Sequence, residues 1–228
     1  MIPLRDENPS RLVPYVNYAV IALCVLVFLW QFALGPVRGQ TAVYALGVIP
    51  AVLLGDTQLP TDVALIPPWL SVITSMFLHG GWLHLLGNML YLWIFGDNVE
   101  DSMGHVRYVI FYVFCGVAAV LAQALPDPTS EVPMIGASGA ISGVLGAYLL
   151  LFPNARIHVL IPLGIVMQSA NVRAMWVLLF WFALQLVSSI FQGGEGAGVA
   201  FRAHIGGFVA GMALVPLLKY RNVRLFAP

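Results

Sequence analysis

The hydrophobic residues of this chain gather in long runs, and charged residues fall mainly at the ends of those runs. A helix that crosses the hydrocarbon core of a bilayer needs about 20 residues, and fewer where it is tilted or buried among other helices. The pattern predicts an all-α, polytopic membrane protein in which six transmembrane helices form one bundle. The six runs that meet the length requirement are residues 13–34, 81–97, 106–125, 137–152, 174–191 and 202–219.

Two further apolar stretches do not fit this pattern. The first loop, residues 35–80, contains AVYALGVIPAVLLG, which is too apolar for a solvated loop and too short and proline-broken to span. We expect this loop to be re-entrant or interfacial. The stretch IHVLIPLGIVM, at 157–167, raises the same question after the fourth run. We expect it to be interfacial too, and the count would be seven if it spanned.

The composition agrees with a membrane protein. Of the 228 residues 60% are hydrophobic and 9% are charged, and the mean hydropathy is +0.90, outside the range of soluble domains. The formal net charge is +0, which argues against a nucleic acid partner. Both cysteines lie in apolar runs and are interpreted as packing residues. The first run is too long for a signal-peptide core, so we expect it to stay in the mature protein.

The basic residues predict the orientation. Six crossings put both termini on the same side of the membrane, and eight of the ten basic residues flank the runs on that side. Because lysine and arginine concentrate on the cytoplasmic side, we expect cytoplasmic termini. The eight are Arg5, Arg11, Arg107, Arg156, Arg173, Lys219, Arg221 and Arg224, against Arg38 and Arg202 on the other side.

Four polar side chains converge at one depth in this topology. His84 and Asn88 begin the second run, Ser138 begins the fourth and His204 begins the sixth. Even-numbered runs all start on the outer side, and a residue two to four positions inside a helix lies only about 3 to 6 Å below its start. Water can therefore reach all four side chains from outside.

His84 and Asn88 are four residues apart, so they share one face of a helix. One interpretation is structural, since polar pairs of this kind hydrogen-bond across helices in membranes. His79, which precedes the run, is expected to anchor a loop. The spacing HGGWLH differs from the H-E-x-x-H of zinc helices, and no cysteine or carboxylate joins it. We therefore predict no metal site.

Glycines surround the serine of GASGAISG and the histidine of AHIGGFVAG. Pairs of small residues four positions apart let two helices approach until their backbones touch. If the fourth and sixth runs pack in this way, Ser138 and His204 come within hydrogen-bond reach, about 2.6 to 3.2 Å. Alternatively, these small residues serve helix packing alone. The pairs are Gly139 with Gly143 and Gly207 with Gly211.

A serine beside a histidine is a candidate for nucleophilic catalysis. The hydroxyl is a weak nucleophile until a base takes its proton, and neutral histidine, with an ordinary pKa of about 6.5, suits that role. No Asp or Glu lies near His204 in its apolar run, so the sequence supports a Ser138/His204 dyad. The side chains of His84 and Asn88, with the backbone N–H of Ser138, are candidate donors to the oxyanion.

Three stretches, HGGWLHLLGNMLYLWIFGDNVED, GASGAISGVLGAYLLLFPNARI and AHIGGFVAG, resemble the signature motifs of rhomboid intramembrane serine proteases. They occur in the right order on separate runs, and the resemblance covers most of residues 70–215. It implies a six-helix core, cleavage of peptide bonds in or near the transmembrane segments of other proteins, and no cofactor.

By this resemblance, Ser138 is the nucleophile, His204 is the general base, and His84 and Asn88 are oxyanion-hole side chains. The resemblance also implies a lateral gate between the fifth and second helices, with Trp176, Phe180 and Trp181 as candidates. The first loop lacks the Trp-Arg pair of many relatives, so no role is carried over there. The supporting motif residues are Gly136, which opens the G-x-S-G motif, Gly139, Gly207, Gly211 and His79.

We therefore expect an intramembrane serine endopeptidase of the basic bacterial type, a single rhomboid domain over residues 1–228 in the plasma (inner) membrane. Its expected partners are single-span transmembrane substrates, cut near the outer leaflet, and the lipid bilayer. One alternative is a catalytically inactive relative that escorts membrane proteins. A transporter would place polar groups near the midplane and show internal repeats. Neither transport nor packing alone explains why the polar groups share one depth.

Overall fold

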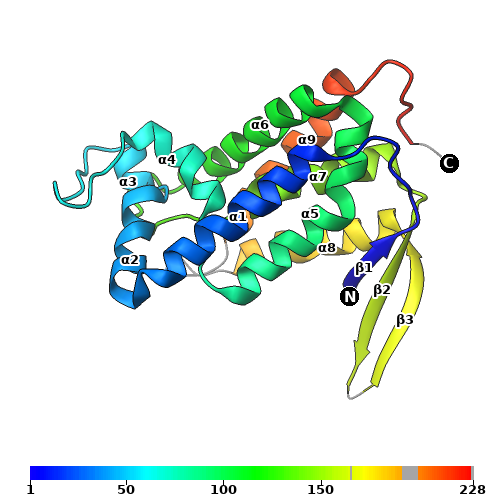
Figure 1. Cartoon of the computed structure of the whole chain (residues 1–228), viewed down its shortest axis with the longest axis horizontal. Helices are drawn as coiled ribbons and strands as arrows, with labels where there is room; N and C mark the ends of the chain where they lie inside the picture. The colour runs from blue at the N-terminus through cyan, green and yellow to red at the C-terminus, as the bar shows by residue number, and fades with distance from the viewer. Residues whose placement is uncertain (165, 192–199, 227–228) are drawn as a thin grey trace.

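The computed structural model describes residues 1–164, 166–191 and 200–226. Within these residues six long helices form a bundle (Figure 1). Each coincides with a predicted run to within one or two residues, except that one helix continues to Met103. The six are α1 (Tyr15–Ala33), α5 (Trp82–Met103), α6 (His105–Ala124), α7 (Ser138–Leu151), α8 (Ala174–Phe191) and α9 (Phe201–Leu218).

The helices differ in how well they could cross a membrane alone. In the part of the chain that the structure describes, α1, α6 and α9 are long and apolar enough. α5 also meets this criterion, but only together with the helical segment Pro68–Phe77 before it, and the two are bent by 81° relative to each other. α7 and α8 are apolar but shorter. The fold is that of an integral membrane protein, while the count of six spans stays a prediction.

α7 is short because it is enclosed. Its 14 residues extend about 21 Å at 1.5 Å per residue, less than the roughly 30 Å of a hydrocarbon core. Nearly all of its side chains are buried, and α5, α6 and α9 pack around it. A helix that is apolar on every side and surrounded by others has no need to match the bilayer thickness. This central position also places the start of α7 inside the bundle.

Glycines set the spacing of α6, α7 and α9. A Cβ atom at Gly207 would collide with the carbonyl oxygen of Gly139, and one at Gly211 with that of Gly143. These glycines of α9 therefore let its backbone touch the backbone of α7. Gly139 itself faces α6, where a Cβ atom would lie 2.6 Å from the Cβ of Ala119. The small residues of α9 thus allow α7 to pack closely against it, and those of α7 allow α6 to do the same.

The described chain is not all-α, because an antiparallel sheet lies at one end of the bundle, here termed the sheet end (Figure 1). β1 (Ile2–Asp6) pairs with β2 (Arg156–Leu163), and β2 pairs with β3 (Val166–Arg173). The stretch predicted to be interfacial is therefore part of a β-hairpin. β3 leads directly into α8, so the hairpin joins α7 to α8.

Alternation along β2 explains this difference. Ile157 and Val159 are fully buried, whereas Arg156 is exposed and His158 is half-buried. Side chains that alternate in this way are typical of a strand with one buried face. The strand was not predicted because the apolar content of the whole stretch concealed its two-residue period, and the interfacial placement of the stretch stays a prediction.

The first loop folds at the opposite end of the bundle, here termed the loop end. It forms α2 (Gly35–Leu46), α3 (Pro50–Leu53), α4 (Pro68–Thr74) and a 3-10 turn η1 (Ser75–Phe77). α2 packs on α1, and α4 packs on α6. The depth of this loop in a membrane stays a prediction.

Carboxylates explain why α5 continues past its apolar run. Glu100 is fully buried and accepts hydrogen bonds from the backbone N–H groups of Val16 (3.0 Å) and Asn17 (2.7 Å). Asp101 binds two further backbone N–H groups just before α1. The first N–H groups of a helix lack partners within it and carry partial positive charge, so carboxylates stabilise them. The polar end of α5 therefore fixes the start of α1.

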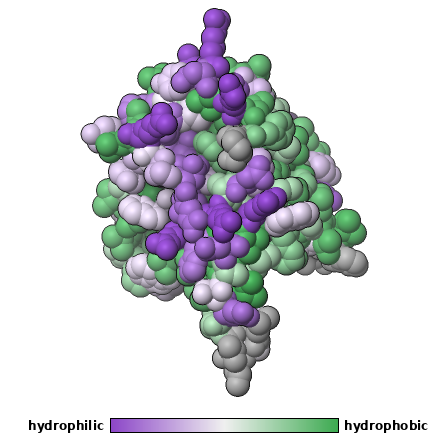
Figure 2. Space-filling model, turned by 90° about the vertical axis from the view of Figure 1, so that its right-hand side faces the viewer, coloured by the Kyte–Doolittle hydropathy of each residue, from purple (hydrophilic) through white to green (hydrophobic). Residues whose placement is uncertain are grey.

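The surface divides into apolar flanks and a polar end. Large side chains such as Leu26, Trp93 and Ile190 are exposed on the flanks, as lipid contact requires. Figure 2 shows the sheet end, where hydrophilic residues gather in the middle of the face and hydrophobic residues surround them. The N-terminal strand and the C-terminal residues up to 226 both lie at this end (Figure 1).

Candidate active site

Ser138 and His204 lie at the beginnings of α7 and α9 and face each other. Ser138 Oγ is 2.8 Å from His204 Nε2, a hydrogen-bond distance. Both helices begin at the loop end, and the glycine contacts between them hold their first turns side by side. The structure thus brings together the two side chains that the sequence pairs, although they are 66 positions apart.

His204 has a second partner that the sequence analysis missed. Its Nδ1 lies 2.8 Å from Oε1 of Gln185, in α8. A neutral imidazole has one N–H and one nitrogen with a free lone pair. If Nδ1–H donates to Gln185, then Nε2 is left to accept the hydroxyl proton of Ser138. A search for an acid near His204 could not find this partner, because it is an uncharged amide on another helix.

His84 lies against the backbone of Gly136, next to Ser138. The Nδ1 of His84 accepts the N–H of Gly80 at 3.3 Å, so the proton of the neutral ring is on Nε2. Gly136 has a φ of 120°, and a Cβ atom there would lie 2.7 Å from His84 Nε2 and 3.7 Å from Ser138 Oγ. Only glycine tolerates both that backbone conformation and that contact. The arrangement leaves an N–H donor close to the serine.

Asn88 follows one turn after His84 on the same face of α5. It is 8% exposed, and its Nδ2 has no hydrogen-bond partner within the described residues. Leaving a buried donor without a partner costs about 1 to 3 kcal/mol, so such a group calls for an explanation. Ser138 is the first residue of α7, and the N–H groups of a first turn are also free. Candidate oxyanion donors therefore come from α5 and from α7.

His79 braces the loop before α5. It is fully buried, and its Nδ1 is 3.2 Å from the carbonyl oxygen of Phe77. The side-chain amide of Gln31, in α1, binds both the backbone N–H and the carbonyl of His79, at 3.3 and 3.0 Å. The ring of His79 packs edge-on against that of His84, with 5.1 Å between centroids. The position of His84 thus depends on that of His79.

The three candidate gate residues lie in different surroundings. The ring of Trp181 is 5.9 Å from that of His204 and 6.1 Å from that of Phe208. Trp176 and Phe180 are 58% and 47% exposed on the outer flank of α8. The structure therefore brings Trp181 to the dyad and leaves the other two on the surface.

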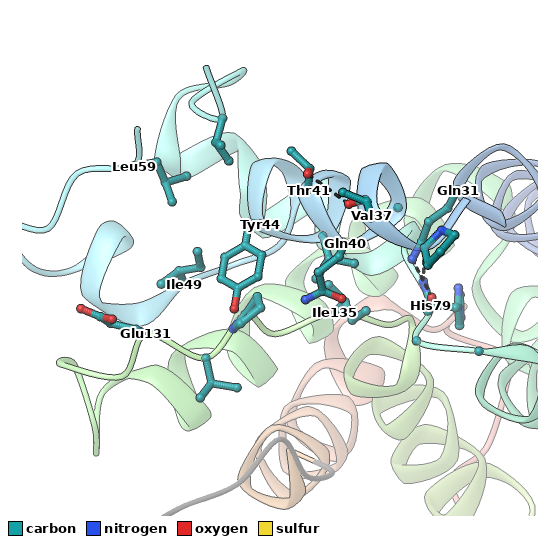
Figure 3. A pocket seen from close by; sticks show the side chains of 18 of the residues that line it. Gln31, Val37, Gln40, Thr41, Tyr44, Ile49, Leu59, His79, Glu131 and Ile135 are labelled. Atoms are coloured by element: carbon teal, nitrogen blue, oxygen red, sulfur yellow. Dashed lines mark hydrogen bonds between the residues drawn. The ribbon is translucent and has the colours of Figure 1, made fainter. Parts of the chain in front are cut away.

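Two hollows are described at the loop end, and Figure 3 shows the larger one. Its volume is about 1660 Å³, and its walls come from α1, α2 and the segment that precedes α7. His79 lines it, whereas Ser138 and His204 are not among the described residues of its wall. Within the residues that the structure describes, no three His, Cys, Asp or Glu side chains cluster as metal ligands would.

Comparison with known proteins gives a consistent result. A family model described as "Rhomboid domain" matches residues 67–221. RHOMBOID-like protein 5 of Arabidopsis thaliana is 33% identical over 164 residues, which are 69% of this chain and 48% of that protein. Rhomboid protease GluP of Bacillus subtilis is 30% identical over 201 residues, 88% of this chain and 35% of that protein.

A shorter relative is Putative rhomboid protease YdcA of Bacillus subtilis, 28% identical over 157 residues, which are 68% of this chain and 73% of that protein. The chain thus spans about half the length of the Arabidopsis relative and about a third of GluP.

Proposed function

The chain belongs to the rhomboid family, and on that premise we propose that it is an intramembrane serine protease that uses a dyad of Ser138 and His204. The observation that carries this proposal is the 2.8 Å separation of Ser138 Oγ and His204 Nε2. The other ring nitrogen is occupied by Gln185. Nε2 is therefore the nitrogen that takes the hydroxyl proton.

In the first half of the reaction Ser138 Oγ attacks the carbonyl carbon of the scissile peptide bond as His204 Nε2 takes its proton. The tetrahedral intermediate collapses when the C–N bond breaks, and His204 gives the proton to the leaving amine. This leaves an acyl ester on Ser138. A water molecule then attacks the ester carbonyl while His204 takes a proton from it. The bond between the acyl carbon and Ser138 Oγ breaks, His204 returns the proton to Oγ, and the new C-terminal acid is released.

The negative charge that develops on the carbonyl oxygen needs donors that are already in place. His84 Nε2–H and the amide of Asn88 are the proposed side-chain donors, and the backbone N–H of Ser138 is the third. The unpartnered Nδ2 of Asn88 supports this role, because it is a buried donor held without an acceptor in the described structure.

The proposed substrates are single-span transmembrane proteins that are cut near the outer leaflet. A helical peptide bond is shielded by its own hydrogen bonds, and exposing backbone groups in lipid costs several kcal/mol each. We therefore expect preferred substrates to carry helix-weakening Gly or Pro and a small residue at the cut. We further propose that the chain crosses a bacterial inner membrane six times, with the sheet end in the cytoplasm. The dyad, at the loop end, is then on the outer side.

A serine-directed fluorophosphonate tests the proposal with the detergent-purified protein. Label on Ser138, located by peptide mass, should be absent in Ser138→Ala and His204→Ala, and the same variants should not cut a model single-span substrate. Ser142→Ala is the matched control, since that serine is in the same helix and, among the described residues, its hydroxyl binds only the Ser138 carbonyl, at 2.6 Å. Folded wild-type protein that neither labels nor cleaves would favour an inactive escort.

A further inference from the structure

We infer that Gln185 is a positioning residue for the proposed dyad: it orients the His204 ring from α8, so that the base is competent only while α8 is seated against α9. The inference rests on the proposed function. It adds a residue, and a dependence on a third helix, that none of the three motifs contains.

The hydrogen bond specifies which nitrogen carries the proton. The Nδ1 of His204 is 2.8 Å from Gln185 Oε1, and its Nε2 is 2.8 Å from Ser138 Oγ. Two neutral tautomers are possible for an imidazole, and only the one with the proton on Nδ1 can accept from serine. An acceptor at Nδ1 favours that tautomer. It also stabilises the imidazolium that forms when the serine proton is transferred.

The backbone and the ring of His204 are held by different helices. The backbone is fixed by the contact of Gly207 with Gly139, which joins α9 to α7. The ring is contacted from α8, by Gln185 through the hydrogen bond and by Trp181 at 5.9 Å. The ring of Phe201, in α9 itself, lies edge-on to the His204 ring at 6.4 Å but offers no hydrogen bond. Glycine contacts between α7 and α9 therefore place the histidine, and the hydrogen bond that orients its Nδ1 comes from α8.

Beside the site, aromatic side chains hold α8 against α9. Phe182 stacks on Phe208 of α9 with 4.5 Å between ring centroids. The outer positions of α8, such as Leu184 and Val187, are 47% and 50% exposed. A displacement of α8 that separates Phe182 from Phe208 also withdraws Gln185 from His204. The orientation of the base therefore follows the position of α8.

The first test replaces Gln185 by leucine, which keeps its size and removes the acceptor. Cleavage should fall about ten-fold to a hundred-fold in kcat, with KM within about two-fold, because the lost bond acts in the transition state. Fluorophosphonate labelling should slow by a similar factor. Gln185→Glu retains an acceptor and should keep activity within about three-fold of wild type. Gln185→Ala should behave as the leucine variant does, which guards against an effect of leucine itself.

The matched control is Gln123→Leu. The side-chain amide of Gln123, in α6, accepts a hydrogen bond at 3.3 Å from the backbone N–H of Ala203, the residue before His204. The substitution therefore removes an amide hydrogen bond to the start of α9 without changing the contacts of the His204 ring. Its kcat and labelling rate should stay within about two-fold of wild type.

A spectroscopic measurement separates this inference from the proposed function. In protein with ¹⁵N-labelled histidine, His204 should show a single neutral tautomer protonated at Nδ1, identified by its loss in His204→Ala. Gln185→Leu should convert that signal to a mixture of tautomers. An unchanged tautomer with unchanged kcat overturns the positioning role and leaves the proposed function intact. If Gln185→Leu changes the tautomer but the wild-type protein never cleaves, the positioning role is supported and the proposed function is overturned.

Phe182→Ala tests the dependence on α8. It removes no hydrogen-bonding group but weakens the stack on Phe208, and it should lower kcat and disturb the His204 tautomer as Gln185→Leu does. Wild-type values for both would overturn the dependence on α8 seating.

Discussion

Replacing Gly207 by alanine tests whether the contact between α7 and α9 sets the distance between Ser138 and His204. A Cβ atom at Gly207 would collide with the carbonyl oxygen of Gly139, which is the residue directly after the proposed nucleophile. Neither partner is a flexible side chain. The collision can therefore be relieved only by moving the two helices apart by about 1 Å, against close packing on all sides of α7.

The expected loss follows from the site geometry. Ser138 Oγ and His204 Nε2 are 2.8 Å apart, and a further separation of about 1 Å exceeds the range of a hydrogen bond. A misplacement of about 1 Å can cost about a hundred-fold in rate. Overpacking of this kind costs about 1 to 3 kcal/mol of stability. Gly207→Ala should thus lose about two orders of magnitude in kcat while it still folds.

The assay is cleavage of a model substrate in parallel with unfolding in mixed micelles. Gly87→Ala is the matched control, because it also changes a helical glycine, and a Cβ atom there meets no described atom within 4 Å. That variant should be unchanged or slightly more stable, since alanine favours helix by about 1 kcal/mol over glycine. A Gly207→Ala protein with wild-type kcat would refute the reasoning that backbone contact sets the dyad distance.

Two further predictions concern other groups. Asn88→Ala should lower kcat about a hundred-fold to a thousand-fold if Asn88 donates to the oxyanion. The free energy of unfolding should stay the same or rise, because the Nδ2 that is removed has no partner within the described residues. Kinetics and unfolding are measured on the same protein, and a fall in both kcat and the free energy of unfolding would contradict the prediction. Burial, with a smaller effect from the charge of Asp97, raises the pKa of the Asp6 carboxyl from 3.8 to about 6. The folded state therefore holds this proton more tightly than the unfolded state, so stability should fall as pH rises from about 4 through 6. Thermal unfolding of Asp6→Asn should show a smaller fall over that interval, and an identical pH profile would reject the assignment to Asp6.

The helices of the bundle could be predicted because their apolar runs are continuous and bounded by polar residues. The end of α5 could not, since Glu100 and Asp101 are charged and yet belong to the helix, where they bind the start of α1. The β-hairpin was missed for the opposite reason. Its residues are as apolar as those of a membrane segment, and only the alternation of Ile157 and Val159 with polar neighbours indicates a strand. Gly164, with a φ of 66°, marks the turn.

The candidate site was predictable where the backbone determines it. Gly207 and Gly211 must be small for α9 to touch α7, so the same glycines that appear as a motif also bring Ser138 to His204. The interpretation of Gly139 needed correction, because its missing side chain makes room for α6 rather than for α9. Gln185 could not be predicted, since a single amide in an apolar helix has no spacing that relates it to a histidine in another helix.

This difference bears on how an active member of the family is distinguished from an inactive escort. Retention of Ser138 and His204 is not sufficient, because the glycine contacts would bring the two side chains together whether or not the ring is correctly rotated. Consider a chain with the same three motifs and a hydrocarbon side chain in place of Gln185. Its histidine ring could adopt two orientations and two neutral tautomers, and only one combination would keep the 2.8 Å contact with a nitrogen that can accept the serine proton. The serine would then face the wrong nitrogen for part of the time. The group that selects the orientation lies in α8, outside the motifs, so activity has to be judged from the side chains that α8 presents to the histidine as well as from the dyad itself.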